Sequence, residues 1–276
     1  MKKIGYVLSG GGARGFAHLG VLKLLEEIGI RPYAIAGTSV GAVIGALYAS
    51  GKTAEEIHQL MKANKYFGWG NIAWLKKGLF SMDVLSKLLN DTIGQNDFTA
   101  LEIKLFVATT DLIKGETVIL SKGNLSEAVI ASASMPVLFA PIKSGERLLV
   151  DGGITENLPV APLKEICDVI IGSNVNQIAD ATLNTDFSKT SNILDRCFHL
   201  AIARSVWAES SKCDVYIEVP LHGFDMFDAK KADKIFKIGY DTAVKFKEQI
   251  KAITQNTLPG NTVSFTCATA DYSPYK

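Results

Sequence analysis

Short apolar runs alternate with segments of helical periodicity along most of this chain. The runs predicted as strands are residues 3–9, 33–37, 103–110, 116–120, 147–150, 168–173 and 214–219. The helical patterns are residues 15–29, 40–50, 54–64, 82–93, 126–134, 190–210 and 229–250. Strands that are apolar along their whole length are typical of parallel sheets buried on both faces. We therefore expect a three-layer α/β fold, with a mostly parallel central sheet and helices on both faces.

The length of 276 residues favours one large domain, and no internal repeat or low-complexity segment divides the chain. We expect a single domain over residues 1–250. Residues 251–276 show no clear period, so a late strand and a loose tail both stay open. The 29 basic residues nearly balance the 28 acidic ones, so we expect no nucleic-acid partner.

No charged residue lies between positions 32 and 51. A bilayer span needs roughly 20 apolar residues, so the window is long enough. However, glycines and hydroxyl groups at Gly37, Thr38, Ser39 and Gly45 weaken its transfer into lipid. A short buried strand followed by a helix of small residues explains the window better.

The N-terminus has the lysines and the start of the apolar run that a signal peptide would have. Its apolar run, residues 4–8, is too short, and a glycine-rich loop follows at once. The four cysteines form no C-x-x-C pair, so we expect reduced thiols and no zinc site. Both features favour a cytoplasmic location.

A glycine-rich loop, Gly10–Gly15, follows the first predicted strand and leads into a helix. It fits the dinucleotide-binding pattern G-x-G-x-x-G, but the second strand ends in Ala36-Gly37-Thr38, without the acidic residue that would hold a ribose. Exposed amides at a helix N-terminus can bind any anion, including an oxyanion that exists only in a transition state. Arg14 could add charge there. The alternative is a plain strand–helix turn with Arg14 in solvent.

Gly37-Thr38-Ser39-Val40-Gly41 is a G-x-S-x-G sequence between a predicted strand and a predicted helix. That is the context of a nucleophile elbow, a strained turn in which bulky neighbours would clash with the serine. The alternative is that Thr38 or Ser39 simply caps the helix. Together with the upstream glycine loop, the pattern favours Ser39 as a nucleophile.

A serine nucleophile needs a base, and the residues alone leave two candidates. His222 follows the last predicted strand, where a Ser-Asp-His hydrolase would place its histidine. The other histidines fall within helical patterns: His18, His58 and His199. Asp151 ends an apolar strand and precedes Gly152 and Gly153, at the sheet edge where ligands bind. An aspartate serves as a base only where burial raises its pKa, and an ordinary Asp-Gly-Gly turn is the alternative.

Taken together, three motifs resemble the patatin-like phospholipase family: Gly10–Gly15, Gly37–Gly41 and Asp151-Gly152-Gly153. Residues 132–141 and 156–160 also resemble the family's pattern, so the likeness covers about residues 3–220 and is similar to the compact bacterial form.

This resemblance implies a serine–aspartate dyad without histidine, in which Ser39 is the nucleophile and Asp151 the base. It implies an oxyanion hole made by amides of Gly10, Gly11 and Gly12, with Arg14 and Gly15 in the same motif. It also implies hydrolysis of a lipid ester without a metal or other cofactor.

Two other functions stay open from the sequence: a Ser-His-Asp esterase that uses His222, and a non-catalytic regulatory protein on the same fold. Residues 66–80 combine five aromatic side chains with Lys76 and Lys77, a composition that suits a lipid–water boundary. We expect this segment to form a cap over the acyl pocket and to touch the inner face of the membrane. A loop packed on the core is the alternative.

Overall fold

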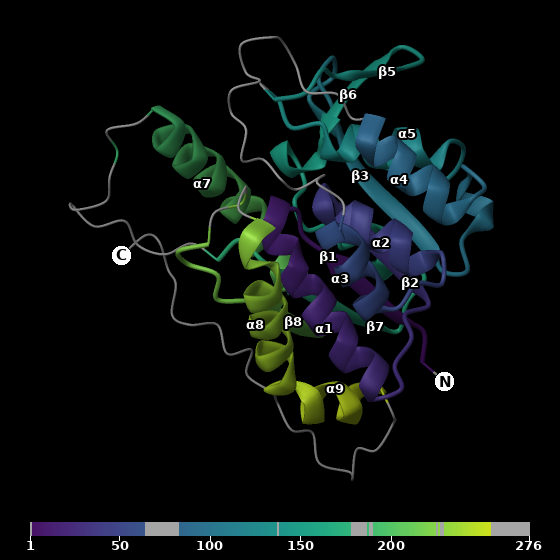
Figure 1. The fold of residues 1–276 in the computed structure, drawn as a ribbon, viewed down its shortest axis with the longest axis vertical. Helices are drawn as coiled ribbons and strands as arrows, with labels where there is room; N and C mark the ends of the chain where they lie inside the picture. Colours follow the sequence, from purple (N-terminus) through teal and green to yellow (C-terminus); the bar gives the residue numbers. More distant parts are fainter. Residues whose placement is uncertain are drawn as a thin grey trace.

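The computed structural model describes residues 2–63, 83–136, 138–177, 187, 190–224, 226 and 229–254. Within these residues, eight strands form one sheet, in which consecutive members of the series β5-β6-β3-β2-β1-β7-β8 are hydrogen-bonded to each other and β4 also pairs with β3 (Figure 1). The strands are β1 (Ile4–Leu8), β2 (Ala34–Thr38), β3 (Lys104–Asp111), β4 (Glu116–Leu120), β5 (Ile142–Ser144), β6 (Arg147–Asp151), β7 (Val169–Asn174) and β8 (Val215–Glu218).

Strands β3, β2, β1, β7 and β8 are parallel to their neighbours in this order, whereas β4, β5 and β6 pair in antiparallel fashion. The helices are α1 (Phe16–Glu27), α2 (Val40–Ala49), α3 (Ala54–Ala63), α4 (Asp83–Ile93), α5 (Leu125–Ala133), α6 (Ala161–Lys164), α7 (Thr190–Ser210), α8 (Ala232–Val244) and α9 (Lys247–Thr254). Short 3₁₀ helices include η1 (Gly12–Gly15) and η5 (Gly152–Ile154).

Successive side chains of the central strand β1 enter two different cores. Tyr6 and Leu8 join the larger core, which the helices α1, α2 and α8 cover. Val7 points to the opposite face and joins a smaller core with Leu163 of α6 and Ile202 of α7. Helices therefore cover both faces of a mostly parallel sheet, which confirms the predicted fold class.

The uncharged window of residues 32–51 forms β2, a turn at Ser39 and the ten-residue helix α2. Every residue of β2 and of α2 is buried, so the missing charges reflect the protein core. Among the helices in the described ranges, none is both long enough and apolar enough to cross a bilayer.

Several elements, including the four-residue helix α6, differ from the sequence-based expectation. Strand β5 was not expected; it has three residues and forms a hairpin with β6 through Gly145, which has a φ of 61°. The helix predicted over 229–250 is divided into a 3₁₀ turn, α8 and α9. The break near Lys245 contains neither glycine nor proline, so no local signal marks it. Helix α9 crosses the expected domain boundary at residue 250, and residues 255–276 lie outside the described part.

Candidate active site

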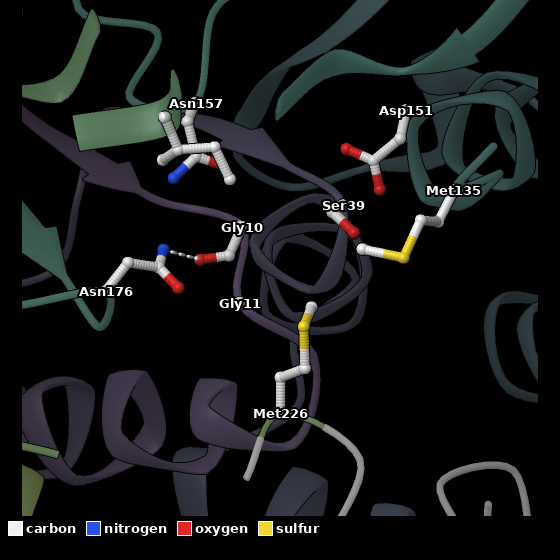
Figure 2. A pocket seen from close by; sticks show the side chains of 9 residues that line it. Gly10, Gly11, Ser39, Met135, Asp151, Asn157, Asn176 and Met226 are labelled. Carbon is white, nitrogen blue, oxygen red and sulfur yellow. Dashed lines mark hydrogen bonds between the residues drawn. The ribbon is translucent and has the colours of Figure 1, made fainter. Parts of the chain in front are cut away.

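Strand β3 brings Ser39 and Asp151 together. Thr38, the last residue of β2, pairs with Ala108 of β3, and Asp151, the last residue of β6, pairs with the next residue, Thr109. β2 and β6 occupy the same edge of β3, because β4 pairs with its other edge along both stretches. The two strands run in opposite directions, so their carboxyl ends meet. Figure 2 shows the Asp151 carboxylate close to the Ser39 side chain.

Ser39 sits on a strained turn, as the sequence predicted. Its φ of 53° and ψ of −123° make it the one non-glycine residue with positive φ in the described part of the chain. Such a conformation costs about 1–3 kcal/mol and persists only where the surroundings enforce it. A Cβ at Gly41 would lie 2.5 Å from the Leu8 carbonyl oxygen, and one at Gly37 would lie 2.5 Å from the Gly41 carbonyl oxygen. Both glycines are therefore needed for the turn to fit.

Two hydrogen bonds fix the turn to its surroundings. The backbone N–H of Ser39 donates to Ser132 Oγ at 2.9 Å, and the Ser132 hydroxyl in turn donates to the Ala108 carbonyl at 2.6 Å. The Thr38 hydroxyl donates to the backbone carbonyl of Glu156 at 2.9 Å. Ser132 thus links α5 to both the turn and β3, a role that its place in an apolar helix did not reveal.

Asp151 is 3% exposed, and its Oδ1 accepts a hydrogen bond from the Gly153 N–H at 2.8 Å. Burial raises the pKa of the Asp151 carboxyl to about 6, while hydrogen bonds from the Ser39 side chain and the Gly153 amide act in the opposite direction. A carboxylate with a pKa in this range is a far better proton acceptor than an ordinary aspartate.

The glycine loop lies beside this pair, and its first backbone N–H is already hydrogen-bonded within the protein. The Gly10 N–H donates to the Asn157 carbonyl at 3.3 Å, and the Gly10 carbonyl accepts from Asn176 Nδ2 at 2.6 Å. Gly11, with a φ of 149°, comes next, and no described residue accepts a hydrogen bond from its N–H. Gly11 is therefore the amide of this loop that is both beside the pair and available to an anion.

Comparison with known proteins shows which family this chain belongs to. Residues 6–164, more than half of the chain, match the description "Patatin-like phospholipase". The chain belongs to the patatin-like phospholipase family.

Curated relatives carry related names. The chain is 30% identical to "Lysophospholipase NTE1" of Coccidioides immitis, over 91% of this chain and 18% of the fungal protein. It is 32% identical to an uncharacterized NTE family protein of Mycobacterium bovis, over 63% of this chain and 49% of that protein. The chain therefore spans about a fifth of the length of the fungal relatives it matches.

Among solved structures, human GIVD cytosolic phospholipase A2 superposes with a TM-score of 0.53 and 11% identity. The match covers 91% of this chain and 60% of the human one. At this identity the likeness shows the fold alone, and it agrees with the mixed, mostly parallel sheet described above.

The patatin motif residues occupy distinct positions in the structure. A small pocket holds Ser39 and Asp151 together with Gly10 and Gly11, whereas Arg14 is not part of its lining. Instead, Arg14 Nε donates to the Phe224 carbonyl at 2.9 Å, and its Nη1 hydrogen-bonds His199 Nε2 at 2.6 Å. Arg14 thus ties the patatin glycine loop to α7 and to the segment after β8.

The other glycines of the patatin motifs serve close packing. A Cβ at Gly12 would lie 2.3 Å from the Met226 carbonyl oxygen, and one at Gly15 would lie 2.5 Å from Val40 Cγ2. A Cβ at Gly152 would lie 2.3 Å from the Ala108 carbonyl oxygen. These glycines let the loop, α2 and β3 approach one another around Ser39.

His222, the other candidate base, is exposed and does not line this pocket. Three of the residues that do were not singled out from the sequence: Asn176, Ile202 and Met226. Two others, Met135 and Asn157, belong to the stretches 132–141 and 156–160, which the sequence marked only by their family resemblance. The cavity volume is about 10 Å³, close to what one water molecule needs. In the described ranges, no group of three or more His, Cys, Asp or Glu side chains is arranged to hold a metal ion.

Proposed function

We propose that this patatin-like protein is a serine lipid acyl hydrolase in which Ser39 is the nucleophile and Asp151 the base. One observation carries the proposal: a half-buried serine on a strained turn lies beside a buried carboxyl whose pKa is raised to about 6. The names of the family and of the fungal lysophospholipases support an ester-bearing lipid as the substrate.

In the first half of the reaction, Ser39 Oγ attacks the ester carbonyl carbon while its proton passes to the Asp151 carboxylate. The carbonyl electron pair moves onto the oxygen, where the Gly11 N–H stabilises the negative charge. The tetrahedral intermediate then collapses and its bond to the alcohol breaks. Asp151 returns the proton to the leaving alkoxide, so the alcohol departs and an acyl–Ser39 ester remains.

In the second half, water attacks the acyl–Ser39 carbonyl and gives a proton to Asp151. Collapse of this intermediate breaks the bond to Ser39 Oγ, and the proton on Asp151 restores the serine hydroxyl. The fatty acid leaves, and the dyad returns to its starting state. A carboxyl with a pKa near 6 suits both directions of proton transfer, because near neutral pH it can both accept and release a proton readily.

A substrate panel tests the proposed function. Fatty-acid release would be measured from a lysophospholipid, a diacyl phospholipid and soluble p-nitrophenyl esters of increasing acyl length. We expect release from at least one class, and a fluorophosphonate probe should form an adduct on Ser39 with loss of fluoride. A wild-type protein that neither labels nor hydrolyses any ester would instead be a binding or regulatory member of this fold.

We further propose that the protein works in the cytoplasm and touches the inner face of the membrane through residues 66–80. This segment lies outside the described residues, so the proposal rests on its aromatic and lysine content alone.

Replacing both Trp69 and Trp74 by alanine should weaken binding to anionic phospholipid vesicles by about tenfold, because interfacial tryptophans contribute strongly to such binding. Trp207, which is 67% exposed on α7, offers a matched control, and Trp207→Ala should bind as wild type does. Unchanged sedimentation of the double variant with vesicles would refute the contact.

A further inference from the structure

Asn157 has a buried side-chain amide whose NH₂ group has no hydrogen-bond partner among the described residues. The residue follows η5, six positions after Asp151, and is 1% exposed. Its Nδ2 is buried and has no hydrogen-bond partner among the described residues. A buried donor without a partner costs about 1–3 kcal/mol, so folded proteins rarely keep one without a reason.

The position of this amide ties it to the reacting pair. Asn157 lines the same pocket as Ser39 and Asp151, and Figure 2 shows its side chain near Gly10. A Cβ built on Gly10 would lie 2.6 Å from Asn157 Oδ1 and 3.2 Å from the Ser39 Cβ. The end of the amide, Gly10 and the nucleophile therefore meet at one place.

The glycine loop alone supplies few donors at that place. The Gly10 N–H is bonded to the backbone carbonyl of Asn157 itself, which leaves the Gly11 N–H as the available loop amide in the pocket lining. Oxyanion holes hold their developing charge with several preorganised donors, and each one contributes substantially to the rate. A second donor is needed beside Gly11, and Asn157 Nδ2 is a donor in the described pocket lining that has no partner.

We propose that the Asn157 side-chain NH₂ donates to the carbonyl oxygen of the substrate ester and, with the Gly11 N–H, stabilises the oxyanion. The inference rests on the proposed function, because the oxyanion forms only if Ser39 attacks an ester. The two ends of the amide are alike in size, so a half-turn about the last side-chain bond brings Nδ2 to the place beside Gly10 that Oδ1 occupies. Asn157 then acts as a catalytic residue that touches the reacting atoms.

The neighbouring Asn176 shows what a structural asparagine looks like in this pocket. Its Nδ2 donates to the Gly10 carbonyl and its backbone N–H to Asn174 Oδ1, so both donors are engaged. Asn157 has no such use for Nδ2. The contrast separates a residue that holds the loop from one that is free to bind a substrate.

Asn157→Leu tests the proposal, because leucine has nearly the same shape as asparagine but no donor. With a soluble p-nitrophenyl ester, we expect kcat to fall by about 10²–10³-fold and KM to change by less than about threefold. The melting temperature should stay the same or rise, since the change removes an unpaired buried amide. Asn157→Ala should show the same loss of kcat.

A pair of inhibitors separates a donor from a merely structural residue. A trifluoromethyl ketone forms an anionic adduct with the serine, whereas the matching methyl ketone serves as the neutral analogue. Asn157→Leu should weaken the first by a factor similar to its loss of kcat and leave the second unchanged, as expected for a donor to the oxyanion. Equal weakening of both ketones, together with a lower melting temperature, would overturn the proposal.

The outcome also distinguishes this inference from the proposed function. If the wild type labels at Ser39 and hydrolyses esters, and Asn157→Leu keeps its kcat within about threefold, only the role of Asn157 is refuted. A wild type that neither labels nor hydrolyses overturns both.

Discussion

Ser39→Ala is expected to lower kcat for ester hydrolysis by at least about 10⁴-fold, because removal of a serine nucleophile leaves only weak catalysis by the remaining groups. Alanine keeps the Cβ at a φ of 53°, so the strain in the turn and the packing around it stay as they are. The backbone N–H that donates to Ser132 Oγ is also retained. We therefore expect the free energy of unfolding to stay within about 0.5 kcal/mol of wild type.

The measurement is initial-rate kinetics combined with fluorophosphonate labelling and urea unfolding. Ser50 supplies a matched control, since it lies at the opposite end of α2 and its hydroxyl only caps the Leu47 carbonyl. Ser50→Ala should keep full activity and full labelling. Labelling of Ser39→Ala at the wild-type rate would show that the nucleophile lies elsewhere.

Asp151→Asn should lower kcat by about 10³–10⁴-fold, since the amide cannot take the serine proton. In the wild type, kcat/KM should fall about tenfold per pH unit below pH 6, because protonation of the carboxyl at a pKa of about 6 removes the base. The small residual activity of Asp151→Asn should lack this acid limb. His222→Ala should keep the wild-type rate and profile; an inactive His222→Ala beside an active Asp151→Asn would replace the dyad by a histidine mechanism.

Asp151→Asn should also stabilise the folded protein at alkaline pH. Burial raises the pKa of Asp151 in the folded state to about 6, above the value of about 3.9 expected when unfolded. A raised pKa contributes stability that is fully present below about pH 4 and is lost as pH rises through about 6. Two pKa units correspond to about 3 kcal/mol.

Asparagine cannot ionise and still accepts from the Gly153 N–H. Asp151→Asn should therefore raise the free energy of unfolding at pH 8 by up to about 3 kcal/mol, and change it little at pH 4. Denaturant unfolding at both pH values measures the difference. An equal effect at pH 4 and pH 8 would mean that the pKa of Asp151 is the same in the folded and the unfolded protein.

The local features of this site could be read from the sequence. Apolar runs predicted β1, β2 and β6, and the glycines around Ser39 predicted a turn that only small neighbours permit. The end of β6 likewise placed Asp151 at the edge of the sheet. Each of these rests on a short stretch of chain whose chemistry depends little on distant residues.

The long-range features could not be predicted in the same way. Nothing in the local pattern indicates that β2 and β6 share one edge of β3, because strand register is set by the whole sheet. Asn157 was noticed only as part of a family-like stretch, since its unpaired donor exists only after the fold has buried it. Arg14 was expected near the oxyanion, but its partners, Phe224 and His199, come from elements far along the chain.

The pairing of β2 and β6 with the same edge of β3 has a consequence for the order in which the site forms during synthesis. The serine belongs to a turn made early during synthesis, whereas its acid arrives on a strand that emerges from the ribosome more than a hundred residues later. A partly made chain holds Ser39 without Asp151, its proposed proton acceptor, and the proposed dyad is complete only when β6 pairs with β3. The proposed hydrolase would in this way be inactive until its sheet is complete.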